Sequence, residues 1–168
     1  MFAPSATEFT PGNQNMNLPL DASFFARRIN ADGIALIKDF EGLHLTPYLC
    51  PGKIWTIGYG HTRTVRSGMV ITQAQADQLL DEDLGLFERA VSRLVSVSLS
   101  DNQFSALVCF TFNIGIGNFE SSTLLKLLNR GWYEQVPAQL MRWNRANGEV
   151  FGGLARRRAA EARLWNRG

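Results

Sequence analysis

The stretch that decides the fold is residues 40–62, which read FEGLHLTPYLCPGKIWTIGYGHT. Aromatic and β-branched residues surround a Pro-Gly turn, a pattern typical of two short antiparallel strands, here predicted over Leu45–Cys50 and Ile54–Tyr59. Before this stretch, Asn30 can cap a helix whose apolar residues recur every three positions and which should end at Glu41-Gly42. The sequence therefore predicts a hairpin that follows directly on a helix, with Glu41 at their junction.

Downstream of the hairpin, the pattern is helical. Thr72 with Gln75, and Ser100 with Gln103, have the form of capping boxes. The first should open a long helix that runs to about Leu94, and the second a helix that is apolar nearly all round, and so buried and central, ended by the glycines at 115 and 117. Shorter helices are predicted at Ser122–Arg130, Trp132–Trp143 and Gly153–Trp165. The predicted fold is α+β and predominantly helical, with a hairpin lobe (about 43–70), a helical lobe (about 72–168) and a cleft between them.

Length and composition favour a single globular domain over residues 21–168. The chain has 168 residues, of which 45% are hydrophobic and 19% charged, close to the soluble average. Residues 1–20 hold three prolines and three asparagines and predict an extended arm, followed by a short helix at Asp21–Arg28. Since no apolar run is long enough to span a bilayer and no signal-peptide pattern is present, we expect no membrane insertion.

The number of cysteines and the distribution of charge exclude few classes of function. Cys50 and Cys109 are too few for a disulfide framework and lack the spacing of a metal site, so no metal is expected. The net charge is +2, but from Met141 onward seven arginines and two glutamates leave a net charge of +5. Such an end could bind nucleic acid, anionic lipid or an anionic wall polymer, or could be a solvated helix face, and charge does not choose among these.

One group of residues near the hairpin has the character of an enzyme site. Glu41 follows an apolar helical turn, and a half-buried carboxyl can keep a proton to donate near neutral pH. Cys50 and Thr56 lie close to the hairpin turn and could face the same cleft. On spacing alone, the plainer interpretation is stronger: a solvated helix cap, a small hydrophobe in a strand and a common hairpin threonine.

The same stretch resembles the catalytic region of phage lysozymes of the T4 and lambdoid endolysin family, glycoside hydrolase family 24. The similarity lies in Phe40–Leu43, Pro47-Tyr48 and Trp55–Thr62, and it continues through Gln103–Gly115, Ser122–Asn129 and the closing segment Trp143–Trp165. It covers about residues 31–165. The resemblance implies a lysozyme-like fold with the active site between the two lobes.

The resemblance also implies roles for individual residues. The family pattern Glu–x8–Asp–x5–Thr puts the acid on Glu41 and a water-holding hydroxyl on Thr56, but the middle position is Cys50 where the family usually has Asp. Cys50 could replace that carboxylate as base or nucleophile, be a site of oxidation, or mark an impaired enzyme. Candidates for substrate contacts are Tyr59, His61, Asn113 and Arg145, with His61 and Tyr59 also suited to packing roles, and Phe112 is expected in the core.

The function implied is that of an endolysin, a muramidase that hydrolyses the β-1,4 bond between N-acetylmuramic acid and N-acetylglucosamine in bacterial peptidoglycan. Water would be the second substrate, and no cofactor and no nucleic acid would take part. The resemblance further implies a monomer made in the host cytoplasm that reaches the cell wall with the help of a separate holin. Two alternatives remain open: a lytic transglycosylase, which needs only the glutamate, and a non-catalytic wall-binding module that uses the C-terminal arginines.

Overall fold

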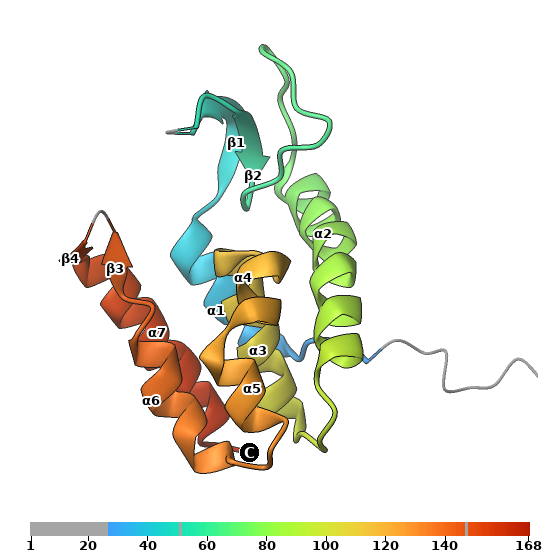
Figure 1. The fold of residues 1–168 in the computed structure, drawn as a ribbon. Coiled ribbons are helices and arrows are strands. Elements are labelled where there is room, and N and C mark those ends of the chain that lie inside the picture. Colours follow the sequence, from blue (N-terminus) through green and yellow to red (C-terminus); the bar gives the residue numbers. More distant parts are fainter. Residues whose placement is uncertain (1–26, 51, 147) are drawn as a thin grey trace, which may run out of the picture.

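The computed structural model describes residues 27–50, 52–146 and 148–168. The helices are α1 (Ala31–Glu41), α2 (Gln73–Leu94), α3 (Asp101–Ile114), α4 (Ile116–Ser121), α5 (Thr123–Leu128), α6 (Val136–Met141) and α7 (Gly152–Trp165), and the strands are β1 (His44–Leu49), β2 (Trp55–Gly58), β3 (Arg145–Ala146) and β4 (Glu149–Val150) (Figure 1). The predicted arm at 1–20 and most of the predicted helix at Asp21–Arg28 lie outside the described residues; of that helix, Arg27 and Arg28 are described and are not helical.

Helix α1 ends where the sequence predicts, and this placement brings Glu41 to the edge of the hairpin lobe. The Asn30 side chain accepts a hydrogen bond from the amide of Gly33 and caps the first turn. At the other end Gly42 adopts φ 72°, a conformation that glycine reaches without strain. The chain then enters β1, which pairs antiparallel with β2 so that Tyr48 lies opposite Thr56. The hairpin prediction is therefore confirmed.

The two capping-box helices form the body of the protein. Thr72 and Ser100 each make the reciprocal capping bonds with the glutamine three residues later, so both predicted starts are confirmed. Helix α2 ends at Leu94 as predicted and connects the two lobes (Figure 1). Residues 104–111 of α3 are all buried, because α1, α2 and α7 pack around this helix. The prediction of a buried central helix is thus confirmed.

The helices of the C-terminal third are shorter and more often interrupted than predicted. Gly115 ends α3 with φ 86°, but the chain resumes a helix at once and Gly117 lies inside α4, so its predicted role as a terminator is wrong. The helix predicted at Trp132–Trp143 is a 3₁₀ turn at Tyr133–Gln135 followed by the short α6. A second hairpin, β3–β4, was not predicted; its turn needs Gly148 at φ 84°.

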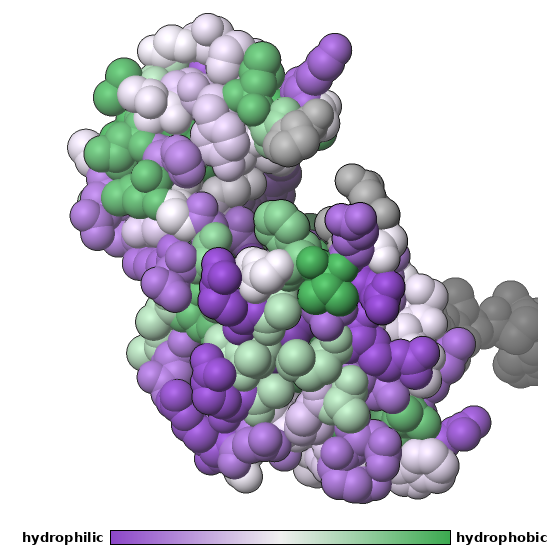
Figure 2. Space-filling view, turned by 90° about the vertical axis from the view of Figure 1, so that its left-hand side faces the viewer, coloured by the Kyte–Doolittle hydropathy of each residue, from purple (hydrophilic) through white to green (hydrophobic). Residues whose placement is uncertain are grey.

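The two lobes differ in size and surface. Figure 2 shows a notch between the small hairpin lobe at the top and the larger helical body, with hydrophobic side chains gathered on the small lobe. The exposed apolar residues in the described part of that lobe include Leu45, Leu49, Ile54 and Val70. The core lies in the helical body around α3. This arrangement leaves the C-terminal end of α1, and Glu41 with it, at the boundary between the two lobes.

Candidate active site

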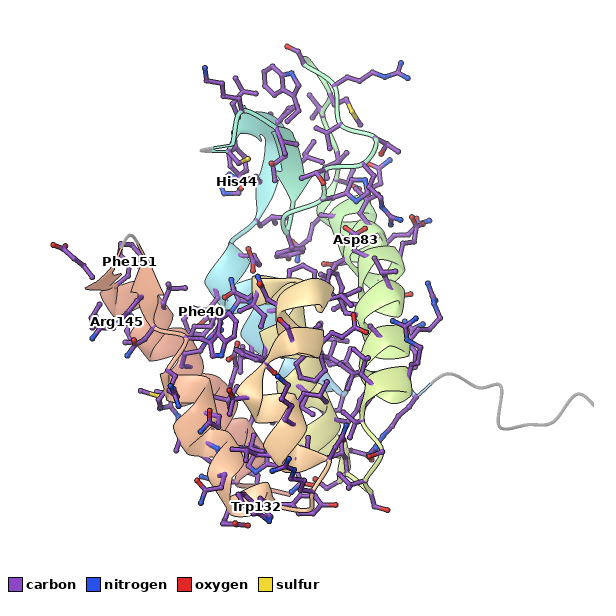
Figure 3. All side chains as sticks on the ribbon, in the orientation of Figure 1. Phe40, His44, Asp83, Trp132, Arg145 and Phe151 are labelled. Carbon is purple, nitrogen blue, oxygen red and sulfur yellow. The ribbon has the colours of Figure 1, made fainter. Side chains whose placement is uncertain are left out.

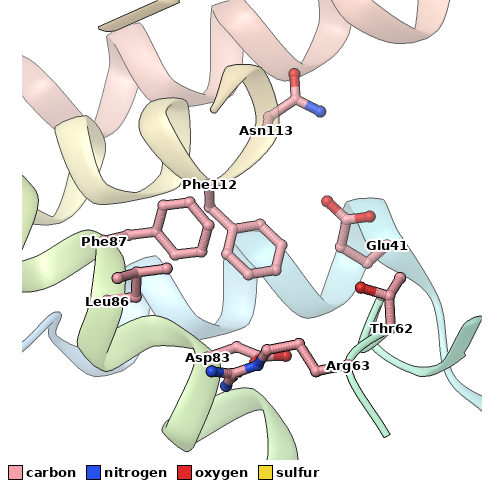
Figure 4. A pocket seen from close by; sticks show the side chains of 9 residues that line it. Glu41, Thr62, Arg63, Asp83, Leu86, Phe87, Phe112 and Asn113 are labelled. Atoms are coloured by element: carbon pink, nitrogen blue, oxygen red, sulfur yellow. Dashed lines mark hydrogen bonds and ion pairs between the residues drawn. The ribbon is translucent and has the colours of Figure 1, made fainter. Parts of the chain in front are cut away.

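A cavity of about 340 Å³ lies where α1, the hairpin lobe, α2 and α3 meet (Figure 4). Its lining comprises Glu41, Gly60, Thr62, Arg63, Asp83, Leu86, Phe87, Phe112 and Asn113. The polar groups come from α1, the loop after β2, the end of α3 and, through Asp83, from α2, which also supplies most of the apolar wall. A concave site with a few converging polar groups is the form that ligand-binding sites usually take.

Glu41 is the carboxyl at the junction of this cavity with the hairpin lobe. Its side chain is 24% exposed, and its Oε1 accepts a hydrogen bond of 2.6 Å from Nη1 of the buried Arg157 on α7. Gly60, at φ 98°, brings its backbone beside the other carboxylate oxygen; a Cβ there would be 3.8 Å from Oε2. The half-buried position expected from sequence is therefore observed, and Arg157 provides a counter-charge that the sequence pattern did not assign to Glu41.

Cys50 and Thr56 lie together at the end of the β1–β2 hairpin and are not among the residues that line this cavity. The backbone amide of Ile54 lowers the pKa of the Cys50 thiol, with further contributions from Gly52 and from the Thr56 hydroxyl. Thr56 is almost fully buried and donates its hydroxyl to the carbonyl oxygen of Ile54 at 3.1 Å. The hairpin thus pairs a partly exposed cysteine, biased towards its thiolate, with a neighbouring hydroxyl.

Tyr48 lies on β1 opposite Thr56. Burial raises the pKa of the Tyr48 phenol, and the negative charges of Glu41 and Cys50 raise it further. Tyr48 also packs against His44, with ring centroids 4.4 Å apart. From the sequence, Tyr48 was noted only as part of a motif.

Of the four predicted substrate contacts, Tyr59 and His61 are buried instead. Tyr59 is 7% exposed, and its ring makes a cation–π contact with the Lys38 ammonium, which lies 5.2 Å from the ring centroid. His61 is bonded on both ring nitrogens, Nδ1 with Asp83 at 2.8 Å and Nε2 with the Thr64 hydroxyl at 3.0 Å. With no free ring nitrogen, His61 has the packing role, and it fixes Asp83 where that carboxylate lines the cavity.

The other two predicted substrate contacts, Asn113 and Arg145, lie in different places. Asn113 lines the cavity with Glu41, and its Oδ1 accepts a hydrogen bond of 2.6 Å from Nη2 of Arg158. Arg145 lies on β3, well away from Asp83 in Figure 3, and donates to the carbonyl oxygen of Gly148 across its own hairpin turn. The cavity therefore includes Asn113 and excludes Arg145.

Aromatic side chains form the wall of the cavity opposite Glu41. The rings of Phe87 and Phe112 meet edge to face with centroids 5.1 Å apart, and both line the cavity (Figure 4). Phe112 is partly buried and packs against the core, so the expectation that it belongs to the core is met only in part, because its ring also lines the cavity. Phe112 directly precedes Asn113 near the end of α3, and this place is the sequence signal that could have indicated an exposed ring, since a helix end reaches the surface.

Two negative observations concern only the described part of the chain. Among residues 27–50, 52–146 and 148–168, no cluster of three or more His, Cys, Asp or Glu side chains is placed to hold a metal ion. Within the same ranges, every helix is too short or too polar to cross a bilayer.

Comparison with known proteins finds relatives that are phage lysozymes or endolysins. The phage lysozyme family model matches residues 38–161. The endolysin of Bacillus phage PZA is 44% identical over 144 residues, which cover 84% of this chain and 56% of that protein. The SAR-endolysin of Enterobacteria phage PA-2 is 34% identical over 128 residues, covering 74% of this chain and 78% of the relative. This chain thus spans little more than half the length of the Bacillus phage protein.

A solved structure has a fold similar to that of this chain. The muramidase domain of SpmX from Asticaccaulis excentricus superposes with a TM-score of 0.79 at 41% identity, covering 83% of this chain and 97% of that domain. The family model covers residues from just before Glu41 to Glu161, and so includes the hairpin, the cavity, and Arg157 and Arg158 of α7. The chain belongs to the phage lysozyme family.

Proposed function

We propose that this protein is a muramidase that hydrolyses the β-1,4 bond between N-acetylmuramic acid and N-acetylglucosamine in bacterial peptidoglycan, and so acts as an endolysin. The observation that carries the proposal is the half-buried Glu41 at the boundary of the two lobes, with Cys50 and Thr56 on the adjoining hairpin. Relatives named endolysin and a structural neighbour named muramidase support the same reaction class.

In the proposed reaction, Glu41 is the general acid. It donates its proton to the glycosidic oxygen while the bond between that oxygen and the anomeric carbon breaks. The positive charge that develops on the sugar ring is stabilised by the Cys50 thiolate, in the place where a carboxylate serves in other members of the family. The lowered pKa of Cys50 supports this role, because a thiolate carries the charge that a neutral thiol lacks.

Water completes the reaction. A water molecule held by Thr56 attacks the anomeric carbon and passes a proton to the Cys50 thiolate, so that the products are two sugar chains with a new hydroxyl on each. Glu41 regains its proton from solvent and Cys50 returns its proton to solvent. Attack from the far side of the ring inverts the anomeric centre, whereas direct attack by sulfur would retain it, so the anomer first formed distinguishes the two roles of Cys50.

Asn113 and the aromatic wall are the proposed substrate contacts. An amide beside Glu41 can bond a sugar hydroxyl or N-acetyl group, and the rings of Phe87 and Phe112 provide an apolar face. Four exposed arginines of the C-terminal segment, Arg142, Arg156, Arg163 and Arg167, add positive charge to the helical lobe, which favours an anionic wall. For access to the wall we propose release through a separate holin; relatives named SAR-endolysins make export without one the competing outcome.

Mass spectrometry of peptidoglycan digested by the protein tests this function. Hydrolysis predicts fragments that end in reducing N-acetylmuramic acid. Fragments that end in anhydro-muramic acid would show a lytic transglycosylase instead. Binding to the wall without release of fragments would show a wall-binding module, and either result would overturn the proposal.

A further inference from the structure

Two consecutive arginines of α7 reach two different polar groups of the cavity wall. Arg157 Nη1 donates to Glu41 Oε1 at 2.6 Å, and Arg158 Nη2 donates to Asn113 Oδ1 at 2.6 Å. Both arginine side chains are buried, at 5% and 0% exposure. Helix α7 supplies none of the residues that line the cavity, yet it bonds the acid on α1 and the amide at the end of α3.

Glu161 joins these two arginines one turn further along α7. Its Oε1 accepts from Arg157 Nε at 3.3 Å and from Arg158 Nη2 at 3.1 Å, and its Oε2 lies 3.0 Å from Arg158 Nε. The Glu161 side chain is fully buried. The result is a continuous chain of contacts from Glu41 through Arg157, Glu161 and Arg158 to Asn113.

The geometry of the guanidinium explains why such an anchor matters. Its donors lie in one plane and point in fixed directions, so a carboxylate that holds Nε also fixes the direction of Nη1. With Nε held by Glu161, Nη1 of Arg157 points at Glu41. Without that contact, the long arginine side chain could follow the Glu41 carboxyl into other rotamers, and misplacement of a catalytic group by about 1 Å can cost on the order of 10²-fold in rate.

We propose that Glu161 is a positioning residue for this cavity: by holding Arg157 and Arg158 together, it fixes the Glu41 carboxyl and the Asn113 amide relative to each other. Glu161 touches neither substrate nor cavity, and acts only through the two arginines. The proposal rests on the proposed function for its kinetic readout, but the contacts that it predicts do not depend on catalysis.

Glu88 offers a matched control. It is also a buried carboxyl, 1% exposed, and it accepts from the amide of Ile29 at 2.9 Å and pairs with Nε of Arg28 at 3.3 Å. These contacts tie α2 to the segment before α1, and none of them involves a residue that lines the cavity. A purely structural buried carboxyl should therefore behave as Glu88 does.

The test compares Glu161→Gln, Glu161→Asp and Glu88→Gln, each corrected for its folded fraction, on soluble peptidoglycan fragments. Glutamine replaces one acceptor oxygen by an NH₂ donor that faces the arginine donors, so Glu161→Gln should lower kcat about 10- to 100-fold and also raise KM through Asn113. Glu161→Asp keeps both acceptors and should recover part of kcat. Glu88→Gln should lose stability and keep both constants. A folded Glu161→Gln with kcat and KM within about two-fold of the parent would overturn the proposal.

A second measurement separates this proposal from the proposed function. The Arg157 Nε–H can be followed by ¹H–¹⁵N NMR, and its exchange with solvent should be slow in the parent and in Glu88→Gln but faster in Glu161→Gln. Equal protection in all three would overturn the positioning role even if the protein cleaves peptidoglycan. If the parent cleaves nothing, the exchange result still decides whether Glu161 holds Arg157.

If the Glu161 variants do not fold, Arg157→Lys interrupts the chain of contacts between Glu41 and Glu161. One ammonium cannot reproduce the two separate guanidinium contacts with Glu161 and Glu41, although the charge is kept. We expect kcat to fall by about 10-fold or more while KM, which depends on the Arg158 contact with Asn113, changes less. An unchanged kcat would contradict the proposal.

Discussion

Arg157 on the last helix bonds Glu41 at the end of the first helix, with 2.6 Å between Nη1 and Oε1, across 116 positions of sequence. This contact closes the helical body against the segment that enters the hairpin lobe. It also means that the proposed acid is held in place by the opposite end of the chain. The arginine-rich C-terminal segment, whose charge alone pointed to several kinds of partner, therefore has buried members with a definite structural partner.

Cys50 should react as a thiolate. Because the Ile54 amide lowers the pKa of Cys50, alkylation by iodoacetamide should set in at a lower pH than for an ordinary thiol and should abolish lysis. Cys50→Ser, whose hydroxyl stays protonated, should lose most activity, whereas Cys50→Asp should keep it and resist the reagent. Rates of lysis before and after alkylation measure this.

Cys109 is the internal control for that experiment. It is fully buried in α3, burial raises the pKa of its thiol, and its Sγ–H donates to the carbonyl oxygen of Gly33. Cys109 should therefore stay unlabelled in the folded protein. A Cys50→Ser variant as active as the parent would mean that the thiol has no chemical role and that Glu41 and a Thr56-bound water suffice.

Gly60→Ala should impair both stability and activity. At φ 98° any residue with a Cβ is strained by about 1–2 kcal/mol, and the added methyl would occupy the cavity beside Oε2 of Glu41. Gly68→Ala is the matched control, because Gly68 has a similar φ of 82° but no atom within 4 Å of the added Cβ. Urea unfolding and lysis rates should show similar losses of stability but a loss of activity only at Gly60. Equal activity in the two variants would contradict this prediction.

Glu161 should make the stability of the parent depend on pH. Burial raises the pKa of Glu161 from an ordinary 4.5 to about 7, against the positive charges of Arg158 and Arg157, which lower it, and burial also lowers the pKa of Arg158. Because the folded state binds the proton more tightly than the unfolded state, the contribution of Glu161 to the free energy of unfolding is full below about 4.5 and is lost as pH rises through about 7.

Chemical unfolding of the parent and of Glu161→Gln at pH 5 and pH 8 checks this sign. Glutamine does not titrate, so the stability of the parent minus that of Glu161→Gln should be smaller at pH 8 than at pH 5. The other titrating groups are shared by both proteins and cancel in the difference. A difference that grows with pH would show that the two arginines outweigh burial and lower the pKa of Glu161 instead.

Local signals predicted most of the fold. Asn30, Thr72 and Ser100 are side chains that bond their own helix starts, so the starts of α1, α2 and α3 could be read from a few neighbouring residues. The β3–β4 hairpin escaped prediction because its strands have two residues each, too short for an alternating pattern. Gly117 failed as a terminator because packing of Phe119 in the core holds α4 in place despite the glycine.

The cavity was predicted less completely than the fold, for a physical reason. Glu41 and Asn113 could be named from motifs, but the partners that hold them, Arg157 and Arg158, are distant in sequence. The i,i+4 spacing of Arg157 and Glu161 is a sequence signal for that ion pair, yet spacing along one helix says nothing of a contact with another element. Tyr59 and Arg145 lie outside the lining of the cavity for the converse reason, since a side chain suited to sugars can equally be packed inside or bonded within its own turn.

The most direct test of the account is the activity of Glu41→Gln, measured as release of soluble fragments from purified peptidoglycan, beside Glu134→Gln, which changes an exposed carboxyl on the 3₁₀ turn of the helical lobe. The glutamine variant at 41 keeps the shape of the side chain but cannot transfer a proton. We predict that fragment release falls by at least ~10²-fold in Glu41→Gln, with the fold intact, while Glu134→Gln matches the parent. Release by Glu41→Gln within a few-fold of the parent would contradict the account.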